Sequence, residues 1–210
     1  MSSLPEFIIS TTTTITTDNN LLTDFSRMSS SAALPELVVE KVRVVAHTMG
    51  PVAAGAQLSQ NHWSIYLTVI GGGYVQLNME TNTAPGERKG IFKVTRHLYE
   101  LTTSNVRHWD FSAASNVTVE KILRLIGEKK RNRYRMTPTG VGCRHWVYVS
   151  RLSPELIVAN SLRLTVINDL VQAGYICDNN ATSTLAQVIQ FNYSRNQQPI
   201  LLPMLAGSFY

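Results

Sequence analysis

The sequence predicts an α+β fold in which an antiparallel sheet carries a histidine and packs against a helix that starts at a cysteine. The first observation is a stretch over residues 61–70 where apolar and polar side chains alternate, as in a half-buried strand. The second is a hairpin, because three glycines at residues 71–73 suit a tight turn and residues 74–79 return as the partner strand. The third is a break rich in Pro and Gly at residues 138–142, after which Cys143 stands where a new helix should begin.

The remaining elements complete a single domain over residues 36–210. Residues 1–35 are rich in Ser and Thr and lack periodicity, so we expect a mostly disordered tail there. Thr118 can cap one helix, and Gly174 can close another at its C-terminal end. The other predicted elements are strands over residues 37–47 and 90–101 and helices over residues 118–130 and 161–173. The C-terminal end of the chain shows no clear pattern.

The composition is that of a globular protein with reduced cysteines. With 210 residues, of which 44% are apolar and 16% charged, the chain can bury the core of one domain. Its two cysteines, Cys143 and Cys177, cannot form a disulfide framework or a zinc site, so we expect no metal and no other cofactor. No apolar stretch approaches a membrane-spanning length, and the N-terminus lacks the basic start of a secretory leader. We therefore expect a cytoplasmic location and no membrane partner.

The positive charge is concentrated in one segment. Residues 121–163 contain 10 Lys and Arg against 2 Asp and Glu, a net charge of +8, although the whole chain has a net charge of only +5. A block of this kind attracts polyanions through counterion release. The alternative is a solvated basic face without a partner, which is common for short charge runs.

Cys143 is the candidate nucleophile. A thiol reacts as its thiolate, and a helix N-terminus lowers the thiol pKa through its dipole and its free backbone N–H groups. Gly140 and Gly142 allow the backbone to approach a substrate and to turn amides toward an oxyanion, and Arg144 adds positive potential. The alternative is a buried structural cysteine, which is the usual fate of a lone cysteine. We expect Cys177 to be inert.

His62 is the candidate base. It begins the alternating strand, on the more polar face, together with Ser64 and Tyr66. A histidine in such a place is more often structural, but a cysteine at a helix start gives it a partner for nucleophilic catalysis. If the three glycines form the loop, the hairpin brings Gln76, Asn78 and Glu80 onto the same face, and one of these polar groups could orient the imidazole. We choose Asn78 as the group that orients the imidazole, which is the role of the third member of a catalytic triad.

These motifs resemble a known superfamily. Residues 61–67 read Asn-His-Trp-Ser-Ile-Tyr-Leu, residues 74–77 read Tyr-Val-Gln-Leu, and residues 142–146 read Gly-Cys-Arg-His-Trp. Together they resemble the permuted papain-like superfamily, which includes the lecithin:retinol acyltransferase-like enzymes and the PPPDE peptidases. The resemblance implies that Cys143 is the nucleophile, that His62 is the base and that His145 packs the helix. Gly142 departs from the usual Asn, and the partner strand carries no second histidine.

A narrower resemblance rests on four segments. These are Trp-Ser-Ile-Tyr-Leu at residues 63–67, Gln-Leu-Asn-Met at 76–79, Arg-Tyr-Arg-Met-Thr-Pro at 133–138 and Gly-Cys-Arg-His-Trp-Val at 142–147. The set is similar to the fungal arginine-containing cyclodipeptide synthases and their uncharacterised relatives. In those proteins we expect the cysteine helix to run directly into a Thr-Val-Ile-x-Asp-Leu segment. Here residues 149–164 intervene, either as a genuine insertion or as a gene-prediction artefact.

The narrower resemblance implies an enzyme that makes an arginine-containing diketopiperazine from arginyl-tRNA and a second aminoacyl-tRNA, through an acyl group on Cys143. The basic segment would then bind tRNA, with Tyr134 stacking on the 3′ end. The expected tRNA-binding residues are Lys129, Lys130, Arg131, Arg133 and Arg135, and the expected substrate-binding residues are Glu80, Asp110 and Tyr66, with Glu80 or Asp110 receiving the guanidinium. One alternative is a papain-like thiol hydrolase or lipid acyltransferase that uses no RNA. Another is a nucleic-acid-binding module without catalysis.

Overall fold

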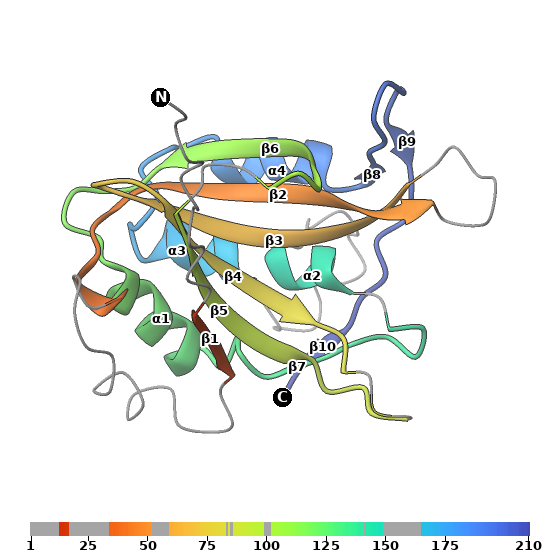
Figure 1. Cartoon of the computed structure of the whole chain (residues 1–210), viewed down its shortest axis with the longest axis horizontal. Coiled ribbons are helices and arrows are strands. Elements are labelled where there is room, and N and C mark those ends of the chain that lie inside the picture. Colours follow the sequence, from red (N-terminus) through yellow and green to blue (C-terminus); the bar gives the residue numbers. More distant parts are fainter. Residues whose placement is uncertain are drawn as a thin grey trace, which may run out of the picture.

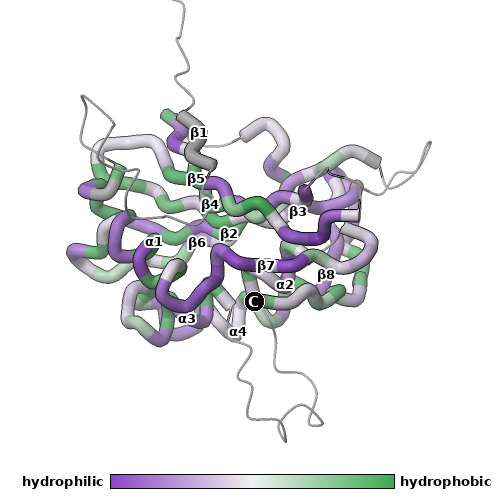
Figure 2. Tube along the Cα trace, turned by 90° about the horizontal axis from the view of Figure 1, so that it is seen from below, coloured by the Kyte–Doolittle hydropathy of each residue, from purple (hydrophilic) through white to green (hydrophobic). Residues whose placement is uncertain are grey.

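A six-stranded antiparallel sheet forms one layer of the protein, and the helices form a second layer on one of its faces (Figure 1 and Figure 2). The computed structural model describes residues 13–16, 34–51, 59–82, 84, 86–98, 102–140, 142–148 and 165–210. The strands lie in the order β1-β5-β4-β3-β2-β6, and each is antiparallel to its neighbours. Their bounds are β1 Thr13–Thr16, β2 Val39–Pro51, β3 Ser59–Val69, β4 Tyr74–Glu80, β5 Ile91–His97 and β6 Asn105–Ser112.

The helices and two small sheets account for the rest of the described secondary structure. The helices are α1 Val119–Glu128, α2 Cys143–Val147, α3 Val166–Gln172 and α4 Ala181–Val188, with a 3-10 turn, η2 Leu34–Glu36, before β2. The small sheets pair β7 Tyr134–Arg135 with β10 Ser208–Phe209, and β8 Phe191–Asn192 with β9 Ile200–Leu201. The described part of the chain is therefore α+β, which confirms that part of the prediction.

The hydrophobic core lies between the main sheet and the helices. Trp63, Ile65 and Leu67 alternate along β3 and are fully buried in one cluster with Ile122 of α1 and Trp146 of α2. This alternation explains why residues 61–70 read as a half-buried strand. The indole N–H of Trp146 donates to the backbone carbonyl of Arg131 at 2.7 Å, so the one polar atom of this large side chain is satisfied inside the core.

The turn between β3 and β4 depends on its glycines. All three residues at 71–73 have positive φ angles of 93°, 100° and 78°, a region that side-chain-bearing residues rarely adopt. A Cβ atom on Gly73 would also lie 2.5 Å from the carbonyl oxygen of His97. The turn sets a register in which Ile65 pairs with Leu77, and this register puts His62 and Asn78 on the same face.

The structure differs from the predictions at both ends of the chain. Residues 13–16, within the predicted disordered tail, form β1 and pair with β5. Strand β6 and helix α4 were not predicted, and the C-terminal end contributes three short strands. The predicted insertion at residues 149–164 and the start of the helix predicted over 161–173 lie outside the described residues.

A buried ion pair joins the basic segment to the helix layer. Arg131 Nε lies 2.6 Å from Asp169 Oδ2 of α3, and the Asp169 side chain is only 3% exposed. We expect Asp169→Ala to lower the free energy of unfolding by about 3 kcal/mol, because it leaves the Arg131 charge buried without a counter-charge. Urea denaturation would measure this loss. Glu128→Ala, which removes the exposed partner of Arg124, should change the same quantity by less than about 0.5 kcal/mol. Equal effects in the two variants would contradict the prediction.

Candidate active site

Cys143 opens helix α2 and is almost fully buried. The preceding Gly142 has a φ of 145°, and a Cβ atom there would lie 3.0 Å from the Tyr134 hydroxyl. That hydroxyl donates to the Gly142 carbonyl at 2.9 Å, and the backbone N–H of Trp146 donates to the same carbonyl at 3.0 Å. A glycine is needed here because only it combines this backbone conformation with so close a neighbour. The helix start that carries the thiol is thus held from two sides.

His62 lies next to Cys143, in the part of the main sheet where strands β3 and β4 are no longer paired. The ladder between β3 and β4 ends at the Ile65–Leu77 pair, so the two strands are not paired at His62. Helix α2 packs against both strands. The Cys143 sulfur lies close enough to the His62 side chain and to the backbone N–H of Trp63 for both groups to lower the pKa of its thiol. The structure therefore brings the predicted nucleophile and the predicted base into direct contact.

Asn78 hydrogen bonds to the far side of the His62 ring. Its Oδ1 lies 2.5 Å from His62 Nε2. Because an amide oxygen can only accept, Nε2 is the nitrogen that carries the proton in this contact. The other ring nitrogen, Nδ1, is then left for Cys143 and can accept the thiol proton. Cys143, His62 and Asn78 therefore lie in a row, with the His62 ring between the other two side chains.

The contact between Cys143 and His62 favours charge separation. Burial would lower the pKa of His62, but the hydrogen bond and negative charge of Cys143, with smaller contributions from Asn78 and Glu80, raise it. Burial would likewise raise the pKa of the Cys143 thiol, but His62, the Trp63 N–H and Arg144 together lower it. A raised pKa of His62 and a lowered pKa of Cys143 both mean that the site favours a thiolate–imidazolium pair. This pair is the reactive form of a nucleophilic cysteine.

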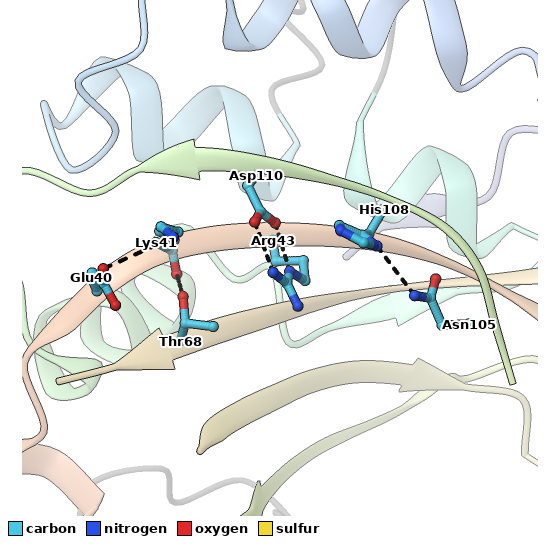
Figure 3. Close-up of polar contacts among 7 residues, drawn as sticks. All are labelled: Glu40, Lys41, Arg43, Thr68, Asn105, His108 and Asp110. Carbon is cyan, nitrogen blue, oxygen red and sulfur yellow. Dashed lines mark hydrogen bonds and ion pairs between the residues drawn. The ribbon is translucent and has the colours of Figure 1, made fainter. Parts of the chain in front are cut away.

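Glu80 and Asp110, the two carboxylates expected to receive a guanidinium, both have partners within the protein. Glu80 accepts from Asn78 Nδ2 at 3.0 Å and pairs with Lys93 Nζ at 2.6 Å. Asp110 forms a two-point ion pair with Arg43, at 2.6 and 2.8 Å (Figure 3). It lies on β6, and β2 separates β6 from the His62 strand. The structure therefore does not bring Asp110 together with Cys143, whereas Glu80 is connected to the site through Asn78.

A second polar cluster, which no motif in the sequence indicates, lies beside His62. His47 Nε2 is 2.7 Å from Ser64 Oγ and 3.2 Å from the Tyr66 hydroxyl, and His47 Nδ1 is 3.0 Å from Ser104 Oγ. Burial and the positive charge of His62 lower the pKa of His47 to about 4, so His47 stays neutral near pH 7. Tyr66, expected as a substrate contact, is buried in this cluster. His47 lies beside His62 because the two residues pair across β2 and β3. No local sequence pattern reveals this pairing, so His47 could not be predicted as part of the site.

Four of the five predicted tRNA contacts are exposed, and we call them the basic strip: Lys129, Lys130, Arg133 and Arg135. Figure 2 colours the stretch at β7 as hydrophilic. The fifth residue, Arg131, is engaged with Asp169 and stacks 4.7 Å over the Phe209 ring, so it supports the fold instead. Tyr134 is fully buried and cannot stack on a nucleotide as expected.

The remaining predicted residues take structural positions. His145 is buried, with its Nδ1 3.1 Å from the Tyr134 hydroxyl and its ring stacked against Tyr134 and Phe209. His145 therefore packs helix α2 against Tyr134 of β7 and Phe209 of β10. Cys177 is exposed, and the site described above does not include it. Within the described residues, no group of three or more His, Cys, Asp or Glu could hold a metal ion, and no helix has the length and apolar character needed to cross a membrane.

Comparison with known sequences gives one family match. Residues 42–153 match the family described as Domain of unknown function (DUF7770). The match covers more than half of the chain and includes His62, Asn78, the basic strip and Cys143. No curated protein and no solved structure matches the chain.

Proposed function

We propose that this chain, which belongs to the family described as Domain of unknown function (DUF7770), is an acyl-transfer enzyme that carries the acyl group as a thioester on Cys143. The observation that carries the proposal is the contact of Cys143 with His62, which in turn bonds to Asn78. The histidine precedes the cysteine in the chain, on a strand that the cysteine helix packs against. This order and packing support assignment to the permuted papain-like fold.

We further propose that the acyl donors are arginyl-tRNA and a second aminoacyl-tRNA. The basic strip offers four exposed cations, and Arg133 and Arg135 flank Tyr134, whose hydroxyl is 2.9 Å from the Gly142 carbonyl. A polyanion on the strip would therefore lie close to the cysteine helix. An aminoacyl ester is already activated, so the reaction needs no ATP and no cofactor at this step.

In the proposed reaction the Cys143 thiolate attacks the ester carbonyl of arginyl-tRNA. A C–S bond forms, the C–O bond to the terminal ribose breaks, and the His62 imidazolium gives the departing oxygen a proton. The amine of the second aminoacyl-tRNA then attacks the thioester, which forms the peptide bond and releases the thiolate, and His62 accepts the amine proton. The free arginyl amine finally attacks the remaining ester. This step closes the diketopiperazine and releases the second tRNA, whose ribose oxygen takes the amine proton.

The test is product formation and tRNA binding as functions of salt. Arg133→Gln combined with Arg135→Gln should flatten the slope of log affinity against log salt by about 1.4 to 1.8, at roughly 0.7 to 0.9 per lost phosphate contact. Diketopiperazine formation should fall in parallel, and ribonuclease treatment should abolish it. Arg107→Gln combined with Arg124→Gln removes the same charge from exposed positions on β6 and α1 and should leave the slope unchanged. Activity that survives complete RNA digestion would exclude aminoacyl-tRNA as the donor.

A thiol hydrolase or lipid acyltransferase is the second candidate, and one observation favours it. Ile200, Leu201, Leu202 and Leu205 are exposed, and Arg144, the residue after Cys143, donates to the Leu202 carbonyl at 3.0 Å. This apolar segment lies near the cysteine helix and would suit a hydrocarbon acyl group. The ribonuclease treatment separates the two candidates, because hydrolysis of a lipid ester needs no RNA.

A further inference from the structure

A chain of polar contacts runs from strand β5 to Cys143. Lys93 Nζ lies 2.6 Å from Glu80 Oε2, Glu80 Oε1 accepts from Asn78 Nδ2 at 3.0 Å, and Asn78 Oδ1 lies 2.5 Å from His62 Nε2. The members sit on three neighbouring strands, and Lys93 is the register partner of Asn78. The pairing of the strands therefore fixes the spacing between Lys93, at the charged end of this series of contacts, and His62.

The Glu80 carboxylate determines which end of the Asn78 amide faces His62. An amide can present either an acceptor oxygen or a donor NH2, but a carboxylate only accepts. Glu80 therefore binds the NH2 and turns the oxygen toward His62 Nε2. We propose that Glu80, held by Lys93, is a positioning residue that acts through Asn78 to keep His62 protonated at Nε2. This role rests on the proposed function of His62 as the partner of a nucleophilic Cys143.

The opposite amide orientation would disable the site. With the Asn78 NH2 toward the ring, Nε2 would have to be the unprotonated nitrogen, and Nδ1 would carry the proton on the side of Cys143. His62 could then neither accept the thiol proton nor form an imidazolium without losing the Asn78 contact. A neutral partner at position 80 can face Asn78 with either of its own ends, so it would no longer select one orientation.

Lys93 completes the arrangement by engaging the second Glu80 oxygen. The side chains of Lys93 and Glu80 are 29% and 37% exposed, so without this ion pair the carboxylate could turn toward solvent. Among the described residues, the other titratable or charged groups around His62 are Cys143 and Arg144 of α2 and His47 of β2. The ring centroids of His47 and His62 are 6.2 Å apart. Unlike Cys143, Arg144 and His47, Glu80 is joined to His62 through the amide of Asn78.

The experiment is alkylation of Cys143 by iodoacetamide across pH, followed on the tryptic peptide over residues 136–144 so that Cys177 does not interfere. The wild-type protein should react at a lower pH than an ordinary thiol does, because the pKa of the Cys143 thiol is lowered by its contact with His62. Glu80→Gln should slow the reaction at that pH about tenfold and move the midpoint of the profile upward. The size is that seen when a metal-bound histidine loses its outer hydrogen-bond partner. Lys93→Gln should act in the same direction. Glu128→Gln, which removes the same charge from an exposed ion pair, should leave the profile unchanged.

A double-mutant cycle shows whether Glu80 acts through Asn78. In an Asn78→Ala background, Glu80→Gln should change the alkylation rate less than twofold, because the amide to be oriented is absent. An equal tenfold loss in both backgrounds would overturn the proposal, since Glu80 would then act as a distant charge. An unchanged profile in folded Glu80→Gln would overturn it as well. Alkylation needs no tRNA, so failure of the cycle leaves aminoacyl transfer standing, and failure of transfer leaves the positioning role standing.

Discussion

Replacement of Cys143 by alanine is expected to abolish diketopiperazine formation completely. The proposed thioester needs the sulfur atom, and no neighbouring group among the described residues replaces it as the partner of His62. Intact-mass measurement after incubation with arginyl-tRNA should show one added arginyl group on the wild-type protein and none on Cys143→Ala. The fold and the tRNA affinity should change little, because one small side chain replaces another at the start of a short helix.

Cys177→Ala is the matched control for this experiment. Cys177 is exposed and lies outside the site, so the variant should retain both the adduct and most of the turnover. Normal turnover by Cys143→Ala would show that the nucleophile is another residue. An adduct that moves to Cys177 would show that the thioester forms without help from His62.

The sequence was informative wherever the determining contacts are local. The alternation over residues 61–70 and the three following glycines predict the β3–β4 hairpin, and that hairpin alone puts His62 and Asn78 on one face. The break before Cys143 likewise predicts the start of α2. The principal residues of the candidate site are therefore predictable from local sequence alone.

The incorrect predictions for individual residues concern contacts between residues far apart in the chain. Arg131 looks like its basic neighbours, and only Asp169 on α3 distinguishes it, by forming a buried ion pair. Glu80 looked like an unoccupied carboxylate because Lys93 belongs to the next strand, at a register that the sequence does not specify. Tyr134 stands between two arginines in the sequence, which favours an exposed ring that could stack on a nucleotide. In the structure the ring is buried, and its hydroxyl donates to the Gly142 carbonyl.

Two elements were missed because their own patterns are weak. Strand β6 lies at the edge of the sheet and exposes Arg107, His108 and Asp110, so few of its residues signal burial. Helix α4 buries only Ala181 and Leu185 and is rich in Thr and Ser, which have low helix propensity. In both elements, tertiary packing decides a conformation that the local sequence does not favour.

The second large effect is expected for His62→Ala, which should lower kcat/KM by a factor of about 10² or more, as for the loss of a general base. The pH dependence should also change. In the wild-type protein the rate should rise with pH through the lowered pKa of Cys143, as the thiolate forms, and fall through the raised pKa of His62, as the proton for the departing ribose oxygen is lost. Without His62 the rising limb should move upward toward an ordinary thiol pKa of about 8.5, and the falling limb should disappear.

His145→Ala separates this role from a structural one. His145 is buried between Tyr134 and Phe209, so its loss should lower the free energy of unfolding while the folded fraction keeps the wild-type pH profile. The measurement is kcat/KM across pH for both variants, with the folded fraction of each determined by circular dichroism. A fully folded His145→Ala protein without activity, beside an active His62→Ala protein, would exchange the two roles. The base would then be the histidine two residues after the nucleophile, and the permuted arrangement would be wrong.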